Sequence, residues 1–88
     1  MGDVFVIELV HEGTVLPVEV FLVNVHYSYR ASVTLNDIEV IYKPEEYGHR
    51  AMIKKNKNRV ISEEEKTIID LVGEELTARM YHDAMVFA

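Results

Sequence analysis

The chain has 88 residues, no cysteine and a formal net charge of −6 at pH 7, with 49% hydrophobic and 27% charged residues. This length suits one domain with a thin core, and the composition is that of a folded rather than a disordered protein. Without cysteine, disulfides and thiolate metal sites are excluded, which fits a cytoplasmic, reducing location. The sequence holds no run of about 20 apolar residues, so no membrane span is predicted.

Basic residues are concentrated in one segment. Residues 50–59 contain five of the nine basic residues and no acid, whereas the other four stand against fifteen acids. A protein that binds duplex nucleic acid usually has the opposite overall sign, because phosphate contacts supply most of its affinity, so nucleic-acid binding is not expected. The segment either holds an anion or an acidic partner, or is an ordinary solvated loop. Its candidate residues are Arg50, Lys54, Lys55, Lys57 and Arg59.

The first forty residues are rich in valine and alternate with a period of two. Residues 4–10 predict a strand that ends in a short turn, where Gly13 is available for a positive φ. A second strand is predicted from residue 15 to about residue 29. Its apolar side chains change parity near residues 20–23, which predicts a long, bent strand that is bulged or buried on both faces.

A similar change of parity occurs in the third predicted strand, between residues 33 and 42. Asn36 and Asp37 lie at the change. They form either a two-residue hairpin turn or a bulge within one long strand. We expect the bulge, because a hairpin would leave arms of only four to six residues. Residues 44–48 are expected to end the sheet, and residues 44–61 to form a loop or a small basic hairpin.

A C-terminal helix is predicted over residues 62–85. Ser62 and Glu65 have the spacing of a capping box, and three glutamates in the first turn suit the positive end of the helix dipole. The predicted buried stripe consists of Ile68, Ile69, Val72, Leu76, Met80 and Ala84. The end of the helix is unusually apolar for a terminus, so it is expected to dock in an oligomer interface. The residues proposed for that interface are Tyr81, Met85 and Phe87.

Together these elements predict a single α+β domain over residues 1–88. We expect an antiparallel β-meander of three or four long, bulged strands within residues 1–43, with the amphipathic helix packed on one sheet face. The other face would expose apolar side chains, and exposed patches of that size usually mark an interface. The sequence therefore predicts a homodimer or a larger homo-oligomer.

One strand pattern carries candidate chemistry. Asn24, His26, Ser28 and Arg30 alternate with apolar residues in the second predicted strand. On one exposed face they would bind an anionic ligand or support acid–base chemistry. Alternation in a half-buried antiparallel strand explains the same pattern without any function.

Metal sites, cofactors and catalysis find no support in the motifs. No pair among the four histidines has the close spacing of metal ligands on one strand face or helical turn. There is no glycine-rich phosphate loop and no nucleophile elbow, so we expect neither a cofactor nor, on balance, an enzyme. The leading hypothesis is a small non-enzymatic binding or assembly protein that acts through protein contacts, such as a regulator, inhibitor or accessory subunit. Its brevity is typical of phage and mobile-element proteins.

The alternative hypothesis is a binder of anions or small molecules, or a minor enzyme. Its site would lie at a subunit boundary and use the strand face of His26, Ser28 and Arg30. A concave, ordered pocket would favour this alternative, whereas a broad, flat surface would favour the assembly protein.

Overall fold

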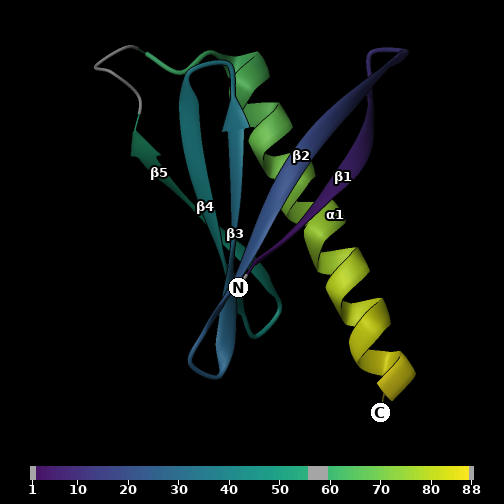
Figure 1. Cartoon of the computed structure of the whole chain (residues 1–88). Coiled ribbons are helices and arrows are strands. Elements are labelled where there is room, and N and C mark those ends of the chain that lie inside the picture. Colours follow the sequence, from purple (N-terminus) through teal and green to yellow (C-terminus); the bar gives the residue numbers. More distant parts are fainter. Residues whose placement is uncertain (1, 56–59, 88) are drawn as a thin grey trace.

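The computed structural model contains five strands followed by one helix. It describes the backbone of residues 2–55 and 60–87, and the side chains of residues 2–54 and 60–79. The strands pair in chain order as one antiparallel sheet, and the helix runs diagonally across one face of this sheet (Figure 1). The predicted α+β class, the antiparallel meander and the C-terminal helix are confirmed. The elements are β1 Gly2–His11, β2 Thr14–Val25, β3 Ser28–Leu35, β4 Ile38–Glu45, β5 Gly48–Lys55 and α1 Glu63–Phe87.

Every connection within the sheet is a turn of two residues. Two-residue hairpins favour turns with positive φ, because such turns match the twist of the flanking strands. Glu12 (φ 51°) and Gly13 (φ 75°) both adopt this conformation in the first turn, and His26 (φ 54°) and Asn36 (φ 56°) begin the second and third.

Neither change of apolar parity is a bulge. Residues 20–23 pair with β1 in continuous register, and Phe21 and Val23 are about half exposed on the face opposite the buried Val20. The expected strand over residues 15–29 is split, because β2 ends at Val25 and a new strand starts at Ser28. Asn36 and Asp37 form a hairpin turn between β3 and β4. The expectation of short hairpin arms failed because β3 starts before residue 33, which gives both arms eight residues.

The sheet also continues beyond residue 43. Residues 46 and 47 form the fourth turn, and β5 then pairs with β4 from the Glu45–Gly48 pair to the Glu39–Lys55 pair. The register shifts once in this pairing, next to Glu39. Residues 48–55 are therefore an edge strand of the main sheet, and neither a loop nor a separate hairpin.

The hydrophobic core lies between one sheet face and α1. It is built from alternate residues of the strands and from the predicted stripe of the helix, in which Ile69, Val72 and Leu76 are buried and Ile68 is partly buried. The sheet contributes Ile7, Leu9, Val18, Val20, Ala31, Val33, Ile38, Val40 and Tyr42. We call this side of the sheet the covered face.

The first turn of α1 is anchored by the predicted capping box. The Ser62 backbone N–H donates to Glu65 Oε1 at 3.0 Å, and the Glu65 N–H donates to Ser62 Oγ at 3.1 Å. Glu65 is buried, and its Oε2 accepts a hydrogen bond from Asn36 Nδ2 at 3.0 Å. One carboxylate thus caps the helix and joins it to the β3–β4 turn. In the described part of the chain, no helix is long and apolar enough to cross a membrane.

Candidate protein-binding face

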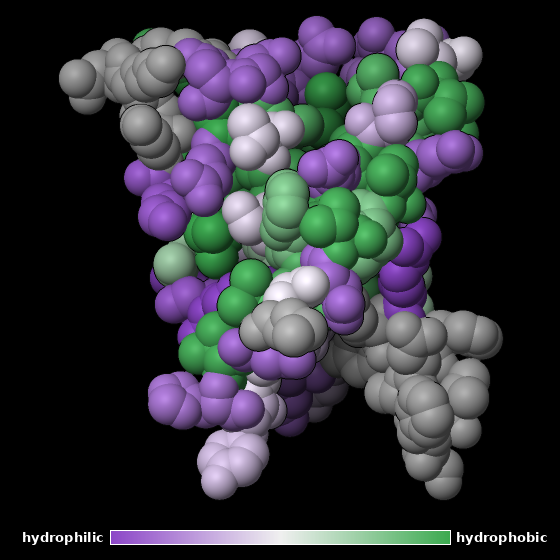
Figure 2. All heavy atoms as spheres, in the orientation of Figure 1, coloured by the Kyte–Doolittle hydropathy of each residue, from purple (hydrophilic) through white to green (hydrophobic). Residues whose placement is uncertain are grey.

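The sheet face opposite α1 is uncovered in the described part of the chain. Because strand side chains alternate between faces, each core residue has neighbours that point the other way. Val6 is 50% exposed although Ile7 beside it is 1% exposed, and Phe21 is 50% exposed next to the fully buried Val20. Hydrophobic residues gather over β1 and β2 in Figure 2. We call this side the open face.

One row of mostly apolar residues crosses the whole open face. The strand registers pair Val4 with Phe21, Phe21 with Ser32, Ser32 with Ile41, and Ile41 with Met52. The row therefore takes one residue from each of the five strands, and only Ser32 is polar. Val4 is 54% exposed and Met52 is 38% exposed, so apolar surface reaches solvent at both ends. This set is the apolar row.

A second row, directly beside the first, carries three cations. Lys43 pairs with Arg50 across β4 and β5. Arg30 lies opposite Lys43 and continues the row on β3. This position follows from the antiparallel pairing of the neighbouring residues Ala31 and Tyr42. Within the described chain, none of the three forms an ion pair, and Arg30 donates from Nη1 to the Tyr29 carbonyl at 3.0 Å. Like charges directly opposite one another repel, so this basic row favours an anionic neighbour.

The described charges on the open face cancel, in contrast to the protein as a whole. Among the described side chains, strand parity places four acids and four bases on this face, a sum of zero, against −6 for the entire chain. Lys54 Nζ lies 3.9 Å from Glu39 Oε2. The acids are Glu8, Glu19, Glu39 and Glu45, and the bases are Arg30, Lys43, Arg50 and Lys54.

The structure separates the predicted polar ladder. Asn24 has the parity of Val20 and points to the covered side, beyond the core, whereas Ser28 and Arg30 point to the open side. His26 lies in the turn between the two strands. Only Arg30 enters the basic row, because the four residues were assigned to one strand that is in fact two.

The predicted basic segment is brought to the open face in part. Arg50 and Lys54 lie on β5 with the same parity as Met52. Lys55 pairs with Glu39 through its backbone, but its side chain lies outside the described residues, as do Lys57 and Arg59 entirely.

The predicted interface at the end of α1 stays a prediction. Tyr81, Met85 and Phe87 belong to the helix, and their side chains lie outside the described residues. The backbone of the last helical turns projects past the edge of the sheet (Figure 1).

Sequence reasoning missed Lys43, the middle member of the basic row. The signal was present, because Lys43 has the parity of Ile41 on the same strand. Placing Lys43 beside Arg30 and Arg50 required the correct turn positions, because the turns set the register that aligns β3, β4 and β5.

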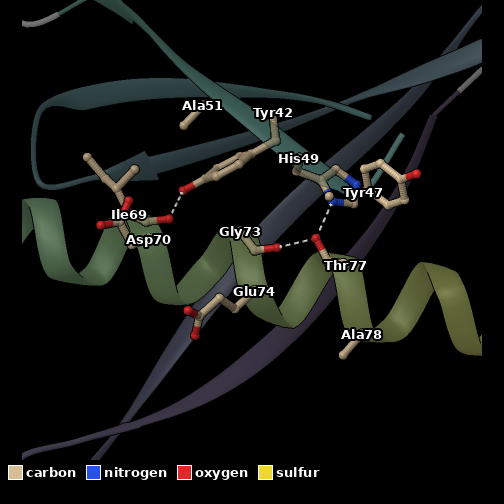
Figure 3. A pocket seen from close by; sticks show the side chains of 11 residues that line it. Tyr42, Tyr47, His49, Ala51, Ile69, Asp70, Gly73, Glu74, Thr77 and Ala78 are labelled. Atoms are coloured by element: carbon tan, nitrogen blue, oxygen red, sulfur yellow. Dashed lines mark hydrogen bonds between the residues drawn. The ribbon is translucent and has the colours of Figure 1, made fainter. Parts of the chain in front are cut away.

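A cleft of about 570 Å³ lies between α1 and strands β4 and β5 (Figure 3). Tyr42 lies at its base, where its hydroxyl donates to the Ile69 carbonyl at 2.7 Å. Burial, and then the negative charge of Asp70, raise the pKa of Tyr42 above its ordinary value. This phenol therefore stays protonated and anchors the helix to the sheet.

His49 connects both elements of this cleft through a directed chain of hydrogen bonds. The Gly73 carbonyl can only accept, so the Thr77 hydroxyl donates to it at 2.9 Å. Thr77 Oγ1 then accepts from His49 Nδ1 at 2.8 Å, which leaves Nε2 to accept from the Tyr29 hydroxyl at 2.6 Å. Burial lowers the pKa of His49, which favours this neutral form of the imidazole.

The cleft therefore holds polar side chains that are engaged with one another. Both His49 nitrogens and the Tyr42 hydroxyl have intramolecular partners, so these groups stabilise the contact between helix and sheet. The open face, by contrast, presents exposed apolar groups and unpaired cations to solvent, and it is the better candidate for binding.

No protein-family model, curated protein or solved structure matches this chain.

Proposed function

We propose that this protein is a non-enzymatic assembly protein that associates with a second copy of itself through the open face. The apolar row carries the proposal, since four of its five positions across the sheet are apolar and three of these side chains, Val4, Phe21 and Met52, are exposed. Removing such side chains from water is favourable by about 25 cal/mol per Å² of apolar surface. A small chain with a thin core gains stability from this cover.

The open face is large enough for a specific interface. Five strands about 4.8 Å apart give a width of about 24 Å, and a strand of nine or ten residues is about 30 Å long. The resulting area, about 700 Å², is close to the roughly 800 Å² that each partner contributes to a standard interface.

The distribution of charge supports a second copy of the chain as the partner that covers the open face. The two chains carry −6 each, so most approaches bring like charges together. The described side chains of the open face sum to zero charge, so two copies can approach through this face without the net repulsion of the chains as a whole. In a two-fold interface each copy offers the same patch, and four acids and four bases are then available for pairing across it.

Light scattering over a dilution series tests this proposal with two matched substitutions. Val4→Lys places a charge in the apolar row, whereas Val60→Lys makes the same change at a 90% exposed position outside the sheet, before α1. We expect the unchanged chain and Val60→Lys to form a dimer or larger oligomer, and Val4→Lys to dissociate at least tenfold more readily. A monomer at every concentration, or equal dissociation of both variants, would overturn self-association.

The second candidate function is binding of an anion at a subunit boundary. The unpaired cations of the basic row favour it, since Arg30 there joins Lys43 and Arg50. His26 and Ser28 contribute less than the sequence pattern suggested, because they lie at and beside the β2–β3 turn. The broad surface of this face favours assembly as the primary role.

A further inference from the structure

The tip of the first hairpin meets the start of the helix at a cluster of three side chains. His11 ends β1, Glu12 begins the turn, and Glu64 lies in the first turn of α1. One ligand atom from each residue falls within 4.8 Å of the others. We propose that His11, Glu12 and Glu64 bind a divalent transition-metal ion, with zinc as the best match.

The imidazole of His11 gives the most direct support. Within the described part of the chain, its buried Nε2 atom has no hydrogen-bond partner, and its side chain is only 15% exposed. A buried polar atom without a partner is unfavourable, and an ion would supply that partner. The atom lies 3.9 Å from Glu64 Oε1, which is too far for a hydrogen bond.

This separation suits two ligands of one ion. Zinc binds histidine nitrogen and carboxylate oxygen at about 2.0 to 2.2 Å, so two of its ligands lie about 3.3 Å apart in a tetrahedral site and further apart at wider angles. A small rotation of exposed side chains brings all three donors into that range, since Glu12 and Glu64 are both exposed.

The donor set indicates the class of ion. One imidazole nitrogen and two carboxylate oxygens suit zinc and its neighbours, whereas calcium and magnesium prefer oxygen alone. Three protein ligands leave a fourth position for water, as in open zinc sites.

A bound ion would link the first hairpin directly to the helix. Such an ion stabilises the fold by mass action, because the three ligands come together only in the folded chain. No local sequence pattern indicates this site, since His11 and Glu64 lie far apart in the chain and no two histidines are closely spaced. The open face plays no part in it, so the site is independent of self-association.

Isothermal titration of the tag-free chain with zinc chloride tests the site. We expect one zinc ion per chain and a rise in melting temperature. His11→Asn should weaken binding at least tenfold, whereas the matched His26→Asn, in the exposed second turn, should bind like the unchanged chain. Ring signals of His11 should shift in NMR spectra on addition of zinc, and those of His26 should not.

A second pair of variants covers the case in which His11→Asn does not fold. Glu64→Gln should also weaken zinc binding at least tenfold, and Glu75→Gln, an exposed change on the same helix, should not. The proposal is overturned if the unchanged chain binds no zinc at millimolar concentration. It is equally overturned if folded variants at both positions bind as tightly as the chain they derive from.

Discussion

The covered and open faces come from the same five strands but differ in how their residues are held. On the covered face, the core side chains are buried, and polar groups where it meets α1, such as Tyr42 and Glu65, are hydrogen-bonded to elements far away in the chain. On the open face, apolar and charged rows lie side by side, and Val6 and Phe21, each next to a buried residue, remain half exposed. Burial under α1, rather than apolar character, therefore distinguishes the face that holds the fold together.

Neighbouring residues of β1 test this contrast with the largest expected effect. Ile7→Ala removes a side chain that is 1% exposed in the core, and it should lower the free energy of unfolding by about 2 to 5 kcal/mol. Val6→Ala, on the open face, should change it by less than about 0.5 kcal/mol. Urea denaturation at a protein concentration low enough for the monomer measures both. Similar losses would show that the open face is packed as well.

The carboxylate that joins α1 to the sheet gives the next largest effect. Glu65→Ala removes the cap to Ser62 and the bond to Asn36, and it should destabilise the fold by about 2 kcal/mol. Glu63→Ala, at a side chain that is 92% exposed in the same turn, should cost less than about 0.5 kcal/mol. Thermal unfolding followed by circular dichroism compares the two. Equal losses would mean that the first turn contributes only through its charge.

The smallest effect is expected from His49, as a dependence on pH. Burial lowers the pKa of His49 below 6.5, so the unfolded chain takes up a proton at a higher pH than the folded chain. Its contribution to stability is therefore complete above about pH 6.5 and declines as the pH falls below that value.

The test compares unfolding free energies from about pH 7.5 to about pH 5.5. The difference between the unchanged chain and His49→Gln should shrink towards low pH, because only the unchanged chain carries this titration. Parallel curves for the unchanged chain and His49→Gln would show that the hydrogen-bonded chain through Thr77 tolerates a charged imidazole.

Local chemistry made part of the fold predictable. Ser62 and Glu65 defined the start of the helix because a capping box needs only neighbouring residues. Gly13 likewise marked the first turn. The second turn was missed because His26–Tyr27 contains no glycine and the apolar alternation continues across it. At Asn36–Asp37 a hairpin turn was one of two interpretations, and the favoured one, a bulge, was wrong.

The candidate sites depend on the register of the strands, so each missed turn changes the expected alignment of the strands that follow it. Arg30 and Arg50 were both candidates, but their alignment with Lys43 needs two strand pairings at once. The contact of His11 with Glu64 depends on where the helix crosses the sheet, which no local pattern specifies. Alternation alone could thus name apolar and basic residues, but could not place them side by side.

The two-residue turns also bear on how the chain folds. Each strand pairs only with its neighbour in sequence, so every hairpin closes a very short loop at little entropic cost. The sheet can therefore assemble one hairpin at a time, from any starting point. Docking of the helix is different, since the bond between Asn36 and Glu65 spans 29 positions. During synthesis the core residues of α1 emerge after all five strands, so the core is completed only once the sheet is available.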